Sequence, residues 1–207
     1  AAALGAGLLA ACGGGDGERT VSGDKSGLLS EPVDTSKQAV RGGTWQTSRT
    51  DDPTTLDPIV NISSLSWTDM VQVYSHLTRP GIRSNKPEAF EGDAAAGWEF
   101  SPDGTQVTFK LRPDLKFDPR PPTNGRALTS ADVKLSFDRF AELSPYRAEV
   151  FHSLSEAAPI ESVSTPDSQT VVIKLAFPYG SIIEMVGFAY YLYILPTEAI
   201  SERFNVK

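Results

Sequence analysis

The 207-residue sequence is poor in the residue types that carry most metal and redox chemistry. It has one cysteine, Cys12, and two histidines, His76 and His152. A single cysteine excludes a disulfide within the chain and cannot by itself build a cysteine-type zinc site. The histidines stand 76 residues apart, and neither is in an HxxxH or HxH spacing or next to the cysteine. The sequence therefore predicts no metal site, and both histidines are expected to be packing or surface residues, with a ligand contact left open for either.

The sequence also lacks the common catalytic motifs. There is no GxSxG elbow, no Walker-type phosphate loop and no GxGxxG after a strand. The acidic residues Asp51, Asp52 and Asp57 do cluster in a predicted loop, so a hydrolase that uses paired carboxylates stays open. Turn formation is the preferred interpretation, because aspartate side chains accept hydrogen bonds from nearby backbone N–H groups in turns.

Positive charge is scarce as well. The chain has 19 basic and 26 acidic residues, a net charge of −7, which argues against a general nucleic-acid binder. With 40% hydrophobic and 22% charged residues, it is ordinary globular material, enough for one domain or two small ones.

The N-terminal region reads as a targeting segment. The small apolar run Ala1–Ala11 is too short to cross a bilayer as a helix, which takes about 20 residues, so a truncated signal peptide is expected over residues 1–12. Leu9–Cys12 resembles a bacterial lipobox, which implies a diacylglycerol on Cys12; a chance cysteine in an alanine-rich leader is the alternative. Residues 13–40 are rich in Gly, Ser, Asp and Lys and are expected to form a flexible tether, or simply a disordered N-terminus.

Three segments carry clear periodicity. Alternating Val107, Phe109 and Leu111 predict a strand with one buried face, after a turn at 101–104. Val171, Ile173 and Leu175 predict a second strand. The arrangement Thr129-x-x-Asp132 predicts the capped N-terminus of a helix whose buried face holds Val133, Phe137 and Phe140.

Other segments are less sharply marked. Residues 66–77 predict a helix that buries Trp67, Met70, Val71, Tyr74 and Leu77 on one face. Residues 44–48 predict a short strand, and the apolar run 190–195, which ends at Pro196, fits a buried strand or helix. Strands and helices without regular alternation or repeats favour an α/β or mixed α+β fold.

Several short motifs occur together in one order along the chain: GGTW, TLDP, AAGWEFSPDGTQVTFKLR, LKF, LTSADVKLSFDR and VVIKL. Together they resemble the family 5 solute-binding proteins, the extracytoplasmic receptors of ABC importers for oligopeptides, dipeptides, nickel complexes and other solutes. The resemblance runs from about Gly42 to Pro196. One departure is the Pro-rich stretch between Phe117 and Leu128, where the family usually has a short FxDG-like turn; it is expected to be a stiff exposed loop.

The resemblance implies a periplasmic-binding-protein-like fold of type II, in which two lobes close over a ligand. Family members are much longer, so this chain is expected to be an N-terminal part whose surface is partly covered by further polypeptide. Residues 41–75 would supply the leading segment of the first lobe, 76–195 a smaller sheet-containing subdomain, and 196–207 the start of the return to the first lobe.

The resemblance also implies a function and a site. Asn61, Ser63 and Ser64 correspond to a segment that lines the ligand cleft, and Tyr146 resembles a tyrosine near that cleft, with packing as its equal alternative. The implied protein is not an enzyme, has no cofactor, and is lipid-anchored at the bacterial membrane, in the periplasm or at the cell surface. It captures an oligopeptide or similar solute for an ABC permease and its ATPase. A secreted hydrolase with an acidic loop and a structural lipoprotein are the alternatives.

Overall fold

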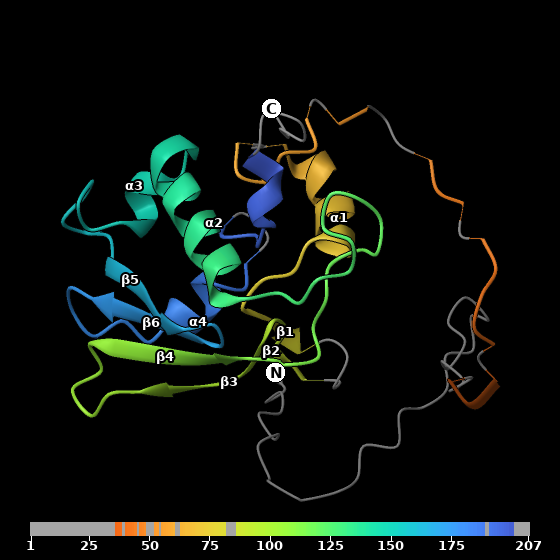
Figure 1. Cartoon of the computed structure of the whole chain (residues 1–207). Coiled ribbons are helices and arrows are strands. Elements are labelled where there is room, and N and C mark those ends of the chain that lie inside the picture. Colours follow the sequence, from red (N-terminus) through yellow and green to blue (C-terminus); the bar gives the residue numbers. More distant parts are fainter. Residues whose placement is uncertain are drawn as a thin grey trace, which may run out of the picture. The chain divides into compact units, whose positions relative to one another are not determined.

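The computed structural model describes residues 36–38, 40–44, 46–48, 52–53, 55–60, 63–81, 86–188 and 191–200. The chain divides into two units, residues 1–47 and 48–207. In the first unit, the described residues form the short 3-10 helix η1 (Ser36–Gln38) and exposed irregular backbone. The other helices and strands among the described residues belong to the second unit (Figure 1).

The strand predicted over residues 44–48 is not formed. Thr44 and residues 46–48 are irregular and exposed, and Trp45 lies outside the described residues. Side chains that favour strands produce one only where a neighbouring backbone is available for pairing, and no strand pairing of the described residues includes this segment. The prediction was therefore wrong because it rested on local composition alone.

Two antiparallel sheets form the centre of the second unit. The larger has the order β3-β4-β6-β5 and is built from β3 (Ala95–Phe100), β4 (Gln106–Leu111), β6 (Thr170–Leu175) and β5 (Ile160–Asp167). The smaller sheet pairs β1 (Thr78–Gly81) with β2 (Lys86–Gly92). With the helices described below, these sheets confirm the predicted mixed α and β fold class.

The two strands predicted from alternation are confirmed, as β4 and β6. Val107 pairs with Ile173 and Phe109 with Val171, and all four side chains are fully buried. Cross-strand apolar pairs of this kind stabilise the sheet and fix its register, because a shift by one residue would turn the apolar side chains to the other face.

The turn predicted before β4 is also present. The N–H of Gly104 donates to the carbonyl oxygen of Ser101 at 2.9 Å, and Gly104 has a φ of +69°, which glycine adopts without a Cβ penalty. The Asp103 carboxylate accepts hydrogen bonds from the Ser101 hydroxyl at 2.6 Å and from the Thr105 N–H at 3.1 Å. Turn chemistry thus accounts for this aspartate.

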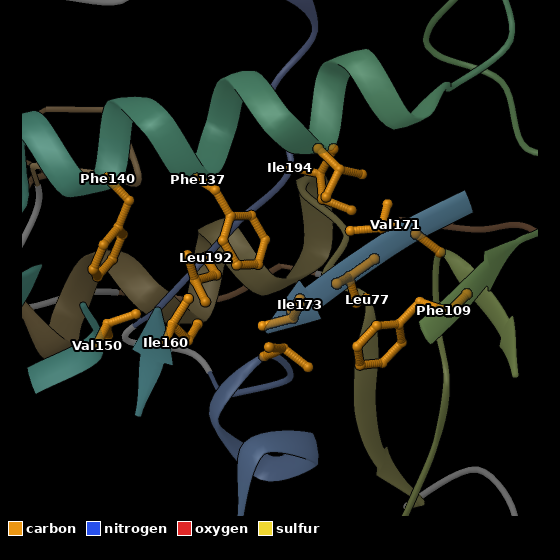
Figure 2. Packing of buried hydrophobic residues seen from close by; sticks show 14 of the residues in the cluster. Leu77, Phe109, Phe137, Phe140, Val150, Ile160, Val171, Ile173, Leu192 and Ile194 are labelled. Carbon is orange, nitrogen blue, oxygen red and sulfur yellow. The ribbon is translucent and has the colours of Figure 1, made fainter. Parts of the chain in front are cut away.

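Helix α2 (Ser130–Leu143) packs across the larger sheet. Its N-terminus carries the predicted capping box, in which the Thr129 N–H donates to Asp132 Oδ2 at 2.9 Å. Val133, Phe137 and Phe140 are at most 1% exposed, as the spacing predicted. Figure 2 shows Phe137 and Phe140 pointing from the helix toward the buried side chains of the sheet.

The helix predicted over 66–77 is shorter: α1 runs over Ser64–Val73. Tyr74 is extended, with φ −105° and ψ 147°, and the carbonyl oxygen of Ser75 accepts the Ile194 N–H at 2.9 Å. This long-range pairing and the burial of Leu77 replace the last helical turn. Val71, predicted to be buried, is 48% exposed.

The chain then returns past α1. The short helices α3 (Arg147–Val150) and α4 (Ile182–Met185) precede residues 191–195, and the 3-10 helix η3 (Thr197–Ile200) follows. Residues 192–195 are buried but form neither a regular strand nor a helix, since Leu192 has a φ of +51° and only Ile194 makes a bridge. Tyr190 lies outside the described residues.

Candidate functional site

The predicted ligand-contact residues fall in two separate places. Ser63 caps the N-terminus of α1 with extended backbone, and its carbonyl oxygen accepts the Ser66 N–H at 3.1 Å. Ser64 is the first residue of α1 and is exposed. Asn61 and the predicted lipid-attachment residue Cys12 lie outside the described residues.

Tyr146 directly precedes α3, which Figure 1 shows on the other side of α2 from α1. Its ring is half-buried and stands edge-on to Tyr191 at 5.9 Å, and the Tyr191 hydroxyl donates to Glu149 Oε2 at 2.6 Å. The structure therefore brings Ser63 and Ser64 together, while Tyr146 packs in an aromatic group apart from them.

Two cavities flank the segment 73–75, which follows α1. The first is about 520 Å³ and lies between this segment, residues 115–123 and the return segment. The second is about 550 Å³ and is bounded by 71–76, Arg79, Pro80, Asp93 and Phe188. Three exposed apolar side chains, Val71 at 48%, Val73 at 76% and Phe188 at 39%, stand at the second cavity. The wall of the second cavity is mainly apolar and suits an apolar group, whereas the first is also lined by the charged residues Lys116, Asp118 and Arg120.

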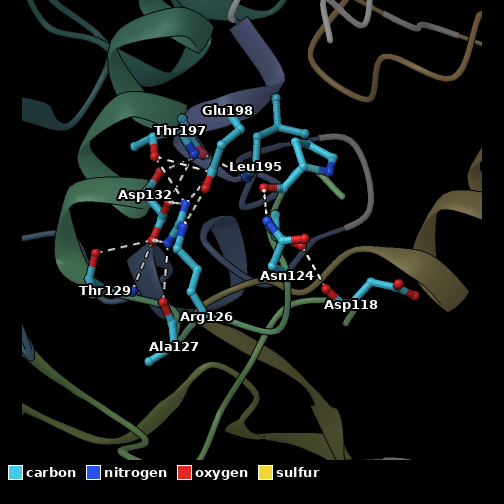
Figure 3. Close-up of polar contacts among 12 residues, drawn as sticks. Asp118, Asn124, Arg126, Ala127, Thr129, Asp132, Leu195, Thr197 and Glu198 are labelled. Atoms are coloured by element: carbon cyan, nitrogen blue, oxygen red, sulfur yellow. Dashed lines mark hydrogen bonds and ion pairs between the residues drawn. The ribbon is translucent and has the colours of Figure 1, made fainter. Parts of the chain in front are cut away.

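Arg126 lies at the centre of an ionic cluster, shown in Figure 3, that local sequence patterns did not predict. The guanidinium donates to both carboxylate oxygens of Asp132 at 2.9 and 2.6 Å, and to both of Glu198 at 2.7 and 2.5 Å. It also lies 4.8 Å from the centre of the Phe117 ring. The Thr197 N–H donates to Asp132 Oδ1 at 2.9 Å. The cluster thus joins the Pro-rich stretch, the start of α2 and η3.

The electrostatics of this cluster keep both carboxylates charged. Burial acts to raise the pKa of Asp132, but hydrogen bonds from Arg126 and from the N–H groups of Thr129 and Thr197 outweigh it and lower the pKa. The hydrogen bonds from Arg126 lower the pKa of Glu198 to about 2. A general acid needs a raised pKa, so this carboxylate pair does not resemble the acid pair of a glycoside hydrolase.

The predicted acidic loop is explained by packing. Asp57 is fully buried, forms an ion pair with Arg139 of α2, and accepts the Ile59 N–H at 3.0 Å. Asp52 is exposed, and Asp51 lies outside the described residues. Asp57 therefore makes the predicted turn contact, and its charge is already neutralised by a cation.

The histidines pack against neighbouring groups, and Arg112 forms an ion pair at the surface. His76 is 5% exposed, and its ring centre lies 4.1 Å from that of Tyr193. His152 Nδ1 lies 3.1 Å from the Ala158 carbonyl oxygen. Arg112 forms an exposed ion pair with Asp114 at 3.1 Å.

Within the part of the chain that the structure describes, no three His, Cys, Asp or Glu side chains are grouped to hold a metal ion. Among the same residues, no helix is both long enough and apolar enough for a membrane span.

Residues 89–205 match the bacterial extracellular solute-binding proteins, family 5, in the segment described as Middle. This match covers more than half of the chain, and the chain therefore belongs to this family of solute-binding proteins. The assignment confirms the resemblance found in the sequence.

Individual relatives give the same result. The chain is 32% identical over 130 residues to the Probable D,D-dipeptide-binding periplasmic protein DdpA of Escherichia coli, an alignment that covers 62% of this chain and 23% of the relative. The curated relatives that the chain matches are much longer, and it spans about a quarter of their length.

Solved structures share the fold. The PBP/SBP MoaA of A. tumefaciens R10 in complex with mannopinic acid is 33% identical, with a TM-score of 0.58 over 73% of this chain and 29% of that one. DppA of Helicobacter pylori in complex with the peptide STSA is 21% identical, with a TM-score of 0.60 over 75% and 32%. The fold is that of part of a type II periplasmic binding protein, as predicted.

Proposed function

We propose that this chain is part of the substrate-binding component of a bacterial ABC importer, which captures a short peptide or similar solute outside the cytoplasm. The observation that carries the proposal is the family match over residues 89–205. Relatives named as dipeptide- or peptide-binding proteins support the choice of solute. The protein delivers the solute to a membrane permease, and the ATPase that drives transport is a separate partner. Its own role is binding, without catalysis.

Asn61, Ser63 and Ser64 form the ligand-contacting segment in this proposal. The N-terminus of a helix presents backbone N–H groups without intrahelical partners, and exposed Ser64 stands at that end of α1. Main-chain hydrogen bonds to an extended peptide supply affinity without reading its side chains, which suits a receptor for many sequences. Tyr146 contributes its hydroxyl from the aromatic group around Tyr191.

The proposal extends to domain organisation and location. Residues 1–12 belong to a signal peptide, Cys12 carries the lipid, and 13–40 tether the protein to the membrane. Residues 41–75 lead into the first lobe, 76–195 form the subdomain with the sheets, and 196–207 begin the return. Membrane fractionation tests this: replacement Cys12→Ser should move the protein from the membrane to the soluble fraction.

A second solute class is favoured by one observation. The relative bound to mannopinic acid is 33% identical to this chain, whereas the one bound to STSA is 21% identical. A small polar acid such as mannopinic acid is therefore the alternative to a peptide.

Calorimetry and thermal unfolding of the gene product that contains this chain distinguish these solutes. Saturable binding raises the melting temperature with ligand concentration, by an amount set by the ratio of concentration to Kd. We expect a dipeptide library to give such shifts, and Ser63→Ala and Tyr146→Phe to weaken them, while exposed Ser153→Ala leaves them unchanged. A response to mannopinic acid alone would replace the peptide by the alternative solute. No response to either, or turnover of a peptide, would contradict the proposal.

A further inference from the structure

Two backbone segments, residues 74–76 and 193–195, cross each other beside α1. The Ile194 N–H donates to the Ser75 carbonyl oxygen at 2.9 Å, in the one antiparallel β-bridge that the described residues form between these segments. The residues around this bridge are buried: His76 is 5% exposed, Tyr193 1% and Ile194 3%. This crossing, residues 74–76 and 193–195, holds the segment after α1 against the segment that precedes η3.

A titratable ring lies inside the crossing. The rings of His76 and Tyr193 are 4.1 Å apart between centres and tilted by 42°. The His76 Nε2 atom and the Tyr193 hydroxyl are both buried, and neither has a hydrogen-bond partner among the described residues. A neutral imidazole tolerates such a place at moderate cost, but a charged one is costly to bury without a nearby anion.

Among the residues that the structure describes, the carboxylates nearest to His76 are already paired with a cation and do not supply that anion. Asp93 accepts the backbone N–H of His76 at 2.9 Å and lies 3.5 Å from the Arg79 guanidinium. Arg79 in turn binds Glu91 at 2.8 Å. The described residues of the return segment, 188 and 191–195, carry no charged side chain, and Tyr74 and Tyr193 have pKa values raised by burial, so they stay neutral.

We propose that the crossing is an acid-sensitive contact: protonation of His76 places a charge without a counter-ion against Tyr193, which the nearby backbone carbonyl groups compensate only in part, and opens the bridge between Ser75 and Ile194. Burial lowers the pKa of His76 from 6.5 to about 4, although the carbonyl groups of Tyr191 and Phe188 act in the opposite direction. Since the folded pKa lies below the unfolded one, the open or unfolded form binds the proton more readily. The stability of the crossing is complete above pH 6.5 and is lost as the pH falls toward 4. The proposal does not depend on which solute the protein binds.

The test compares the full chain with two variants, because the sequence contains only two histidines. In the wild type, the equilibrium constant for opening should rise about tenfold for each pH unit below 6.5, until the pH approaches 4. Amide exchange at Ile194, corrected for its intrinsic pH dependence, reports local opening, and urea unfolding reports the global transition. His76→Gln should remove this pH dependence, whereas His152→Gln, in which a half-exposed ring is replaced, should keep it.

Direct titration of the His76 ring in the wild type by NMR makes the test independent of whether His76→Gln folds. A midpoint near 4 with simultaneous loss of protection at Ile194 supports the proposal. A midpoint near 6.5, unchanged exchange at Ile194 between pH 6.5 and 4, or the same acid response in His76→Gln as in the wild type would overturn it.

Discussion

At the scale of single residues, local sequence patterns predicted the buried charged side chains least well. Asp57 stands in an acidic loop where turn formation was predicted, and it does accept the Ile59 N–H. Its second role, an ion pair with Arg139, joins residues 82 positions apart, and no local pattern records such a distance. Arg139 itself stands on a helix whose apolar face was predicted from Val133, Phe137 and Phe140.

The Asp57–Arg139 pair gives a prediction about stability. Both side chains are at most 6% exposed, so removing one partner leaves an uncompensated buried charge. We expect Asp57→Asn to lower the free energy of unfolding by about 3–5 kcal/mol in urea titrations, and the double variant Asp57→Asn with Arg139→Met to recover part of that loss. Asparagine keeps an oxygen for the Ile59 N–H, which confines the effect to the charge.

The exposed pair Glu161–Lys174 is the matched control, because its side chains are 45% and 57% exposed. Glu161→Gln should change the free energy of unfolding by only about 0–1 kcal/mol. Equal losses in Asp57→Asn and Glu161→Gln would show that burial of the Asp57 pair has no special cost.

At the scale of elements, prediction succeeded where one strand or helix carries its own periodic pattern. The strand β4 alternates strictly, β6 buries Val171, Ile173 and Leu175 at every second position, and α2 combines a capping box with an apolar stripe. Prediction failed where a contact with a distant segment determines the backbone conformation. Helix α1 ends at Val73 because Ser75 pairs with Ile194 of the return segment. The Arg126 cluster was missed for the same reason, since its partner Glu198 is 72 residues away.

The Arg126 cluster predicts a specific acid response. The folded pKa of Glu198, about 2, lies below its ordinary value of 4.5, so the stability it contributes is complete above pH 4.5 and is lost as the pH falls toward 2. Arg126→Met should cost about 1.5–3 kcal/mol at pH 7, as expected for hydrogen bonds to charged groups, and should flatten the fall in stability between pH 4.5 and 2. Urea unfolding across this pH range measures both effects.

Arg120 offers a control from the same loop. Its ion pair with Asp118 is also close, at 2.7 Å, but the Arg120 side chain is 84% exposed. Arg120→Met should leave stability at pH 7 nearly unchanged, because water screens exposed pairs. An unaltered acid profile in Arg126→Met would exclude the cluster as the origin of the response.

At the scale of the whole molecule, the family and fold class could be predicted from the order of short motifs, while the ligand contacts follow only from the family resemblance. Ser63 and Ser64 lie at the start of α1, whereas Tyr146 precedes α3 and lies against Tyr191. The chain spans about a quarter of the length of its curated relatives. A ligand site formed by segments that are distant in the sequence leaves no periodic pattern in any one of them, so periodicity does not predict its residues.

The surface near the cavity beside α1 supplies a last prediction. Val71, Val73 and Phe188 are exposed together there, and contiguous exposed apolar groups favour association. We expect the 207-residue chain to self-associate as its concentration rises, as measured by size-exclusion chromatography with light scattering. Val73→Lys should reduce this, because a solvated charge replaces an apolar side chain that is 76% exposed, whereas Leu154→Lys, outside this surface at 49% exposure, should not. If both substitutions acted equally, the effect would come from net charge, and the surface around Val73 would have no particular part in association.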